Sequence, residues 1–226
     1  MMSSLLRVIL LISLTLAWQL ASQRTGAATD YDYKGEETCV TPFDTQYDRI
    51  ETYLESIATL HDQTTSDAPV SQPHHLGVLR ECLRTAGRFS YIADKSSGPV
   101  EGPRQRTAPD DRWQLPAETE RRGAGDCEDK AIWLYAKLIE KGFHNIRLVV
   151  GKYRIDQPTY HAWVAYYRAG RVYILDPTKA GRLWRITHYP RGFYRPLYSY
   201  SKKNRWCHPG GHRHLGDAGA RHKPAP

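Results

Sequence analysis

The segment after Gly123 constrains the fold most strongly, because its pattern changes from helical to strand-like within a few residues. Apolar residues repeat at three- and four-residue spacing over 127–141, which predicts a helix that Gly142 ends. Asp126 stands just before this helix and is a favourable N-cap residue. The chain therefore begins its most regular helix at Cys127.

Strand-like runs rich in Val, Ile and Tyr follow at 146–153, 160–167 and 172–175. Ala169 and Gly170 separate the last two runs and predict a tight hairpin. Further strands are expected around 183–187 and 196–200. We expect an α+β fold in which the helix packs on a small antiparallel sheet.

Two more helices are expected before this core. Apolar residues at helical spacing predict a helix over 43–60 and a second one over about 76–92. The second helix would bury Leu79, Cys82, Leu83 and Ile92. Residues 96–111 are rich in Gly, Pro, Ser and charge, which predicts a long surface loop near a site.

The first residues resemble an export signal. Arg7 precedes an apolar run over 8–16, and small residues follow as far as Ala28. A signal peptide has an apolar stretch of about 7–15 residues, whereas a membrane-spanning helix needs roughly 20. We predict a signal peptide over 1–27, cut between 21 and 28, and a periplasmic or secreted protein, with an uncleaved anchor as the alternative.

The formal net charge of +8 lies mostly near the C-terminus. Residues 202–226 carry six lysines and arginines against Asp217 alone, so the remaining mature chain is nearly neutral. We expect one domain over 28–207, a basic and His-rich disordered tail over 208–226, and no nucleic-acid binding. The tail would give weak, salt-sensitive contact with anionic surfaces.

Four cysteines are present, at positions 39, 82, 127 and 207. If one is a catalytic thiol, at most one disulfide forms among the other three in an oxidising compartment. We favour a disulfide between Cys39 and Cys82, because both precede the predicted core and would tie the N-terminal segment to a helix.

Three residues have the order and the placement of a catalytic triad. Cys127 lies in the first turn of a helix, where the helix dipole favours a thiolate. His161 opens one predicted strand and Asp176 closes the next, so the two can meet across an antiparallel pair. A nucleophile, a base and a residue that orients the base then follow in the order Cys, His, Asp.

The surrounding sequence resembles the bacterial transglutaminase-like cysteine proteases. The resemblance lies in three segments, namely Gly125-Asp126-Cys127-Glu128-Asp129, Tyr160-His161-Ala162-Trp163-Val164 and Ile174-Leu175-Asp176. Trp113, Pro116 and Glu118 extend it upstream, so it covers about residues 88–180. It implies a papain-like core with a Cys-His-Asp triad, a protein substrate and no required cofactor. The wider superfamily also includes transglutaminases, amidases and deaminases.

The acids around Cys127 allow two interpretations. Asp126, Glu128 and Asp129 stabilise a helix N-terminus by about 0.3–1 kcal/mol each, which explains them as capping residues. The resemblance adds calcium as a candidate ion, because similar periplasmic proteases bind it beside the nucleophile and carboxylates suit it.

An oxyanion hole also needs donors near the thiol. The backbone N–H of Cys127 is one, and Trp113 and Gln114 are alternative candidates for the other. The resulting prediction is an exported cysteine peptidase that cleaves amide bonds of an envelope or surface protein through a thioester. The alternatives are a transglutaminase or amidase acting on glutamine side chains, and a binding module that kept the fold without activity.

Overall fold

The computed structural model describes residues 33–37, 39–62, 72–94, 112–179, 183–202 and 204–209. The predicted signal peptide, the loop at 96–111 and the tail after Pro209 lie outside these residues. Within the described ranges, no helix is both long enough and apolar enough to cross a membrane.

The N-terminal half contains strand β1 (Glu36–Glu37), helices α2 (Asp44–Asp62) and α3 (Gln72–Arg88), strand β2 (Ser90–Tyr91), helix α4 (Pro116–Arg122), strand β3 (Ala124–Gly125) and helix α5 (Cys127–Glu140). The C-terminal half contains strands β4 (Ile146–Arg154), β5 (His161–Arg168), β6 (Arg171–Leu175) and β7 (Leu183–Arg185), a 3-10 helix (Ile186–His188), and strands β8 (Phe193–Ser201) and β9 (Asn204–Cys207).

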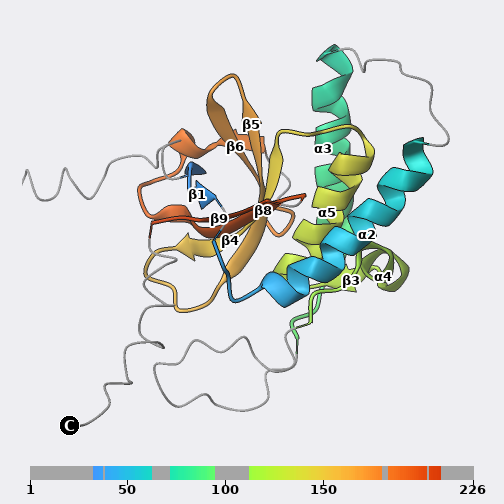
Figure 1. The fold of residues 1–226 in the computed structure, drawn as a ribbon. Coiled ribbons are helices and arrows are strands. Elements are labelled where there is room, and N and C mark those ends of the chain that lie inside the picture. Colours follow the sequence, from blue (N-terminus) through green and yellow to red (C-terminus); the bar gives the residue numbers. More distant parts are fainter. Residues whose placement is uncertain are drawn as a thin grey trace, which may run out of the picture.

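The described strands form one large sheet and one small one. The large sheet has seven antiparallel strands in the order β1-β9-β8-β4-β5-β6-β7, and β2 pairs in parallel with β3. Helices α2, α3 and α5 lie together beside one face of the large sheet (Figure 1). The predicted mixture of helices and an antiparallel sheet is confirmed, but the sheet is larger than expected because β9 and β1, which were not predicted, extend it.

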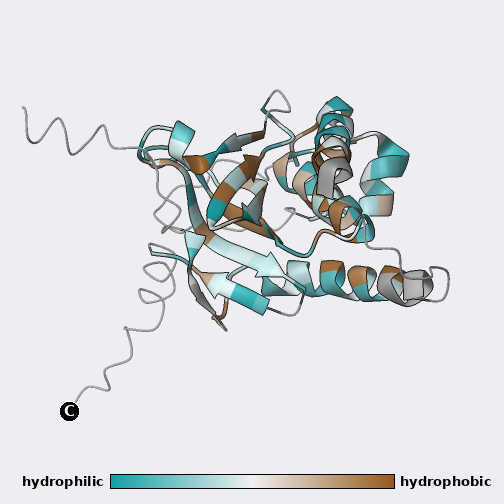
Figure 2. Ribbon diagram, turned by 90° about the horizontal axis from the view of Figure 1, so that it is seen from above, coloured by the Kyte–Doolittle hydropathy of each residue, from teal (hydrophilic) through white to brown (hydrophobic). Residues whose placement is uncertain are grey.

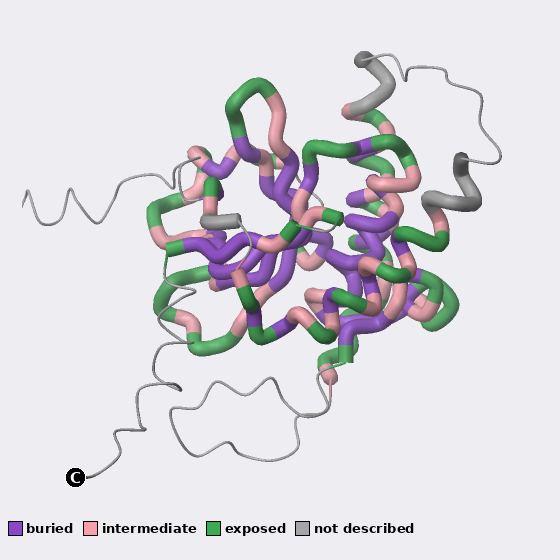
Figure 3. Tube along the Cα trace, viewed as in Figure 1, coloured by how far each residue is buried: buried purple, intermediate pink, exposed green. Residues whose placement is uncertain are grey.

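Alternating residues of the central strands build two cores. On β5, Ala162 and Val164 pack toward the helices, whereas Trp163 and Ala165 belong to a second cluster on the opposite face. Helix α5 is buried along most of its length, so it lies between the sheet and the other helices (Figure 3). Apolar segments accordingly gather in the central strands and on the inner helix faces (Figure 2).

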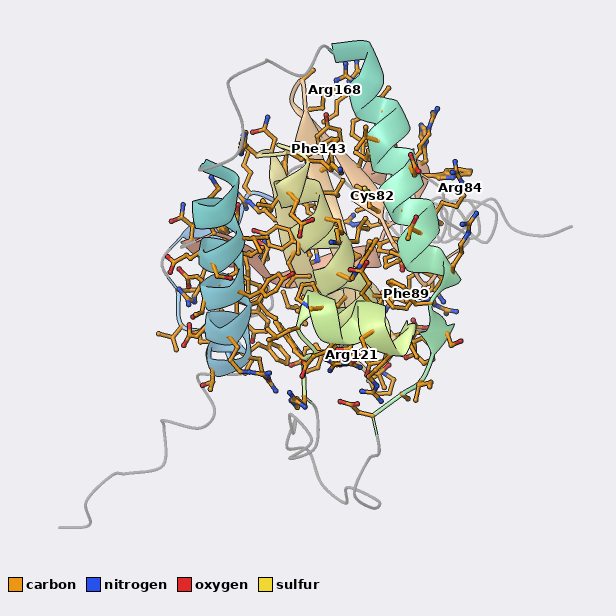
Figure 4. The ribbon with its side chains drawn as sticks, turned by 90° about the vertical axis from the view of Figure 1, so that its right-hand side faces the viewer. Cys82, Arg84, Phe89, Arg121, Phe143 and Arg168 are labelled. Carbon is orange, nitrogen blue, oxygen red and sulfur yellow. A yellow bond between two sulfur atoms is a disulfide. The ribbon has the colours of Figure 1, made fainter. Side chains whose placement is uncertain are left out.

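The predicted disulfide between Cys39 and Cys82 is wrong. Cys39 is bonded to Cys207, and Cys82 is a free thiol on α3, facing the core near α5 (Figure 4). The N-terminal segment joins the sheet rather than a helix, because β1 pairs with β9 and places Glu36 opposite Cys207. Strand β9 was not predicted, so this neighbour of Cys39 was missed.

Two smaller predictions are also corrected. The helix expected over 76–92 begins and ends earlier, as α3, and Ile92 is 53% exposed rather than buried. His208, assigned to the disordered tail, is fully buried and hydrogen-bonded to Ser199, with 2.8 Å between Nε2 and Oγ. The folded part therefore extends to Pro209 at least.

Candidate active site

Cys127 is the first residue of α5, and tight local packing sets its position. Gly125 precedes it in β3, and a Cβ at Gly125 would lie 2.5 Å from the Asp129 Cβ. The Asp126 backbone N–H donates to Asp129 Oδ2 at 3.4 Å, which satisfies one of the free donors at the helix start. The glycine and the capping acid together fix the turn that presents Cys127.

His161 and Asp176 meet across the β5–β6 hairpin, as predicted. His161 Nε2 lies 2.7 Å from Asp176 Oδ2, and Asp176 is only 2% exposed. Thr178 donates to the other carboxylate oxygen from its backbone N–H at 2.8 Å and from Oγ1 at 2.7 Å. Burial alone raises the pKa of Asp176, but the His161 and Thr178 interactions outweigh it, so this pKa is lowered.

The thiol of Cys127 lies beside the start of β5 and is held by a carboxylate. Sγ donates to Glu128 Oε2 at 2.9 Å, and the backbone N–H of Ala162 also hydrogen-bonds to the sulfur. Burial and then the negative charge of Glu128 hold the pKa of the Cys127 thiol well above its ordinary value. No hydrogen bond joins the thiol to His161 in the described residues, although Ala162 directly follows His161.

A carboxylate cluster adjoins the thiol, and it differs in one member from the predicted set. Oxygens of Asp94, Asp126 and Glu128 all lie within 4.8 Å of one another. Asp129 is not a member of this cluster, and its carboxylate accepts hydrogen bonds from Gln114. Asp94 was missed because it lies 32 residues before Asp126, and only the pairing of β2 with β3 brings it near.

Both oxyanion candidates have structural contacts. The Gln114 backbone N–H donates to Asp129 Oδ1 at 2.7 Å, and its side-chain amide donates to Asp129 Oδ2. Trp113 is 2% exposed and stacks on Phe43, with 5.5 Å between ring centroids. No hydrogen bond in the described chain joins either side chain to the thiol, so these contacts place neither residue as the second oxyanion donor.

Aromatic side chains surround the imidazole. His161 stacks on Trp163 at 5.9 Å and meets the edge of Tyr153 at 5.9 Å. Tyr91, in β2, is 59% exposed, and its partial burial together with the charges of Cys127, Asp126 and Glu128 raises the pKa of Tyr91 to about 12. Tyr91 therefore stands at the exposed rim beside the thiol.

No family model and no curated protein matches the chain. The chain is similar in fold to LapG from Legionella pneumophila, with a TM-score of 0.49 and 22% identity over 76% of this chain and 93% of LapG. Calcium-bound LapG gives a TM-score of 0.48 and 22% identity over 68% and 87% of the two chains. EGTA-treated LapG gives 0.48 and 20% over 71% and 84%.

Proposed function

We propose that the protein is an exported cysteine peptidase with a transglutaminase-like core, in which Cys127, His161 and Asp176 form the catalytic triad. One observation carries the proposal. The buried, ionised Asp176 is hydrogen-bonded to Nε2 of His161. The next residue in the strand, Ala162, donates its backbone N–H to the Cys127 sulfur. A nucleophile and a general base need neighbouring groups of this kind to hold them in position.

The chemistry follows from these positions. Because Nε2 of His161 faces Asp176, Nδ1 is free to take the thiol proton. The thiolate of Cys127 then attacks the substrate carbonyl, and the backbone N–H of Cys127 faces the developing oxyanion. The His161 imidazolium gives its proton to the leaving amine, and a thioester remains on Cys127. Water deprotonated by His161 releases the acyl product and restores the thiol.

The carboxylate cluster fits a calcium ion. Asp126 Oδ1 is buried and has no hydrogen-bond partner, and burial together with the charge of Asp94 raises the pKa of Asp126. Asp94, Asp126 and Glu128 would hold the ion, because three oxygens so close together suit a hard cation. Bound calcium would supply positive charge beside the thiol and offset the negative charge that raises the pKa of Cys127.

Removal of calcium should therefore lower both activity and stability. We expect a chelator to reduce turnover about tenfold or more, because a rise of one unit in the thiol pKa costs about tenfold in thiolate. Calcium at about 100 times its Kd should stabilise the fold by about 2.7 kcal/mol. Asp94→Asn should reproduce the effect of the chelator without touching the thiol.

The matched control is Asp156→Asn, which removes an exposed acid that pairs with Arg154 at 2.6 Å, far along the chain from the cluster. This variant should keep the full calcium response in turnover and in thermal melting. Identical melting curves for the parent protein in calcium and in chelator would rule out the calcium site and leave Asp126 and Glu128 as capping residues.

The alternative reactions use the same residues. A transglutaminase or an amidase would form the thioester from a glutamine side chain, and a binding module would use the site without turnover. Tyr91 and the neighbouring Ile92 expose apolar side chains at the rim, which suits a polypeptide substrate of either a peptidase or a transglutaminase.

The deciding experiment incubates the mature protein, with calcium, with envelope and surface proteins, and identifies the products by mass spectrometry. Fragments that form with the parent but not with Cys127→Ser would support the peptidase. Cross-linked chains would identify a transglutaminase, and glutamine deamidation an amidase. The absence of any product with every substrate would favour the binding module.

A further inference from the structure

Tyr194 reaches the catalytic pair from a different strand. It lies in β8, yet its hydroxyl donates to Asp176 Oδ2 at 2.9 Å. The same oxygen lies 2.7 Å from His161 Nε2. Because Thr178 occupies Oδ1, the imidazole and the Tyr194 hydroxyl share Oδ2 between them.

The backbone of Tyr194 is held in an unusual conformation. Its φ is +47°, in the left-handed region that residues with a side chain seldom adopt. The Tyr33 hydroxyl donates to the Tyr194 carbonyl at 2.7 Å, and both tyrosines are 1% exposed. A buried contact from the N-terminal segment thus supports a backbone conformation that is unfavourable by itself.

The ring of Tyr194 is also fixed by its neighbours. It makes edge-to-face contacts with Tyr189 at 4.7 Å, Tyr153 at 5.1 Å and Trp163 at 5.3 Å. Trp163 in turn stacks on His161. Burial and the adjacent charge of Asp176 raise the pKa of Tyr194 far above its ordinary value, so its hydroxyl remains a donor. The hydroxyl therefore has one direction and one protonation state.

We infer that Tyr194 is a positioning residue for the reaction, acting on His161 through Asp176. The inference rests on the proposed function, because it assumes that His161 exchanges a proton with Cys127. The hydroxyl fixes the orientation of Oδ2 and takes up part of its negative charge. His161 is then held in one orientation. Its imidazolium is stable enough to form during the reaction, but not so stable that it fails to release its proton.

A purely structural role would have a different signature. A buried tyrosine that donates to the nearest acceptor contributes to stability, and its loss would leave the protonation of the thiol and imidazole pair unchanged. Tyr200 provides the comparison. It lies in the same strand, is fully buried, and shares a hydrogen bond with Thr41 Oγ1 at 2.5 Å, in a contact with no catalytic residue.

The test measures alkylation of Cys127 by iodoacetamide across a pH series, with calcium present. Cys82→Ser is the background, so that Cys127 is the single free thiol among the described residues. In Tyr194→Phe, the full charge of Oδ2 faces the imidazolium, which then holds its proton to higher pH. The rate of alkylation should change in a step at the pH where His161 loses its proton. We expect the pH of this step to rise by about half a unit or more.

Two reference variants separate the outcomes. His161→Ala should abolish that step, and a profile equal to that of the parent would refute the Cys127–His161 pair and thus the proposed function. Tyr200→Phe should leave the step in place while losing a similar amount of thermal stability. If His161→Ala changes the profile but Tyr194→Phe does not, the role of Tyr194 is wrong and the proposed function stands.

If Tyr194→Phe does not fold, Tyr33→Phe takes its place, because it removes only the hydroxyl that holds the Tyr194 carbonyl. A smaller shift in the same direction is expected. A folded Tyr33→Phe protein with the profile of the parent would then overturn the inference.

Discussion

Cys127→Ala should abolish turnover while leaving the fold intact. Loss of a nucleophile costs roughly 10³-fold or more, because no other group can form the thioester. The Cys127 side chain is only partly buried, and its sulfur hydrogen-bonds only to the adjacent Glu128 and to the backbone N–H of Ala162 among the described residues. We therefore expect a change in unfolding free energy within about 1 kcal/mol. Turnover on a cleaved substrate and thermal melting are the measurements.

Asp176→Asn is the informative contrast to that variant. It should reduce turnover less completely, because Asp176 orients His161 rather than forming a bond to the substrate. It should also destabilise the fold, because a buried carboxylate with four donors is replaced by an amide that cannot accept them all. Cys127→Ala with residual turnover above that of Asp176→Asn would remove Cys127 as the nucleophile.

The dependence of stability on pH under acidic conditions tests whether Asp176 is ionised in the folded protein. Its folded-state pKa is lowered, so its ionised form stabilises the fold above the unfolded pKa of about 3.9. This contribution is lost as the pH falls through the lowered value. Asp176→Asn should therefore be less sensitive to acid than the parent, in addition to being less stable at neutral pH.

Local patterns in the sequence were sufficient for much of the fold. The helix over 127–141 was predicted within one residue of α5, and the strands at 146–153, 160–167 and 172–175 correspond to β4, β5 and β6. Periodicity and turn residues act over a few positions, so they can be recognised without tertiary information. The meeting of His161 and Asp176 followed because a short hairpin fixes the register of its two strands.

Contacts between segments that are distant in the sequence could not be predicted from these local patterns. The pairing of β2 with β3 brings Asp94 to its partners. A left-handed backbone conformation in β8 places Tyr194. The pairing of β1 with β9 places Cys207. Strand β9 is four residues long and follows a tight turn, so its pattern is too short to stand out from the polar tail. The residues that sequence analysis missed are those whose positions depend on contacts between segments far apart in the sequence.

Loss of the Cys39–Cys207 disulfide should be the largest single change in stability. The bond closes a loop with a sequence separation of 168, nearly the whole described domain. A crosslink over a loop of this length stabilises the folded state by about 5 kcal/mol, mostly by restricting the unfolded chain. For a domain of this size, about 5 kcal/mol corresponds to a fall in Tm of roughly 10–20 °C.

The disulfide also secures the segment that supports the active site. Just before Cys39, the chain at Gly35 lies against His208, where a Cβ would meet the imidazole Cε1 at 2.8 Å, and Tyr33 holds the Tyr194 carbonyl. Cys39→Ala with Cys207→Ala should therefore lower turnover as well as Tm, measured on the same preparation. Cys82→Ser is the control, because this thiol has no disulfide partner and is only partly buried. A double variant that melts within a few degrees of Cys82→Ser would show that strand pairing between β1 and β9 holds the N-terminal segment without the crosslink.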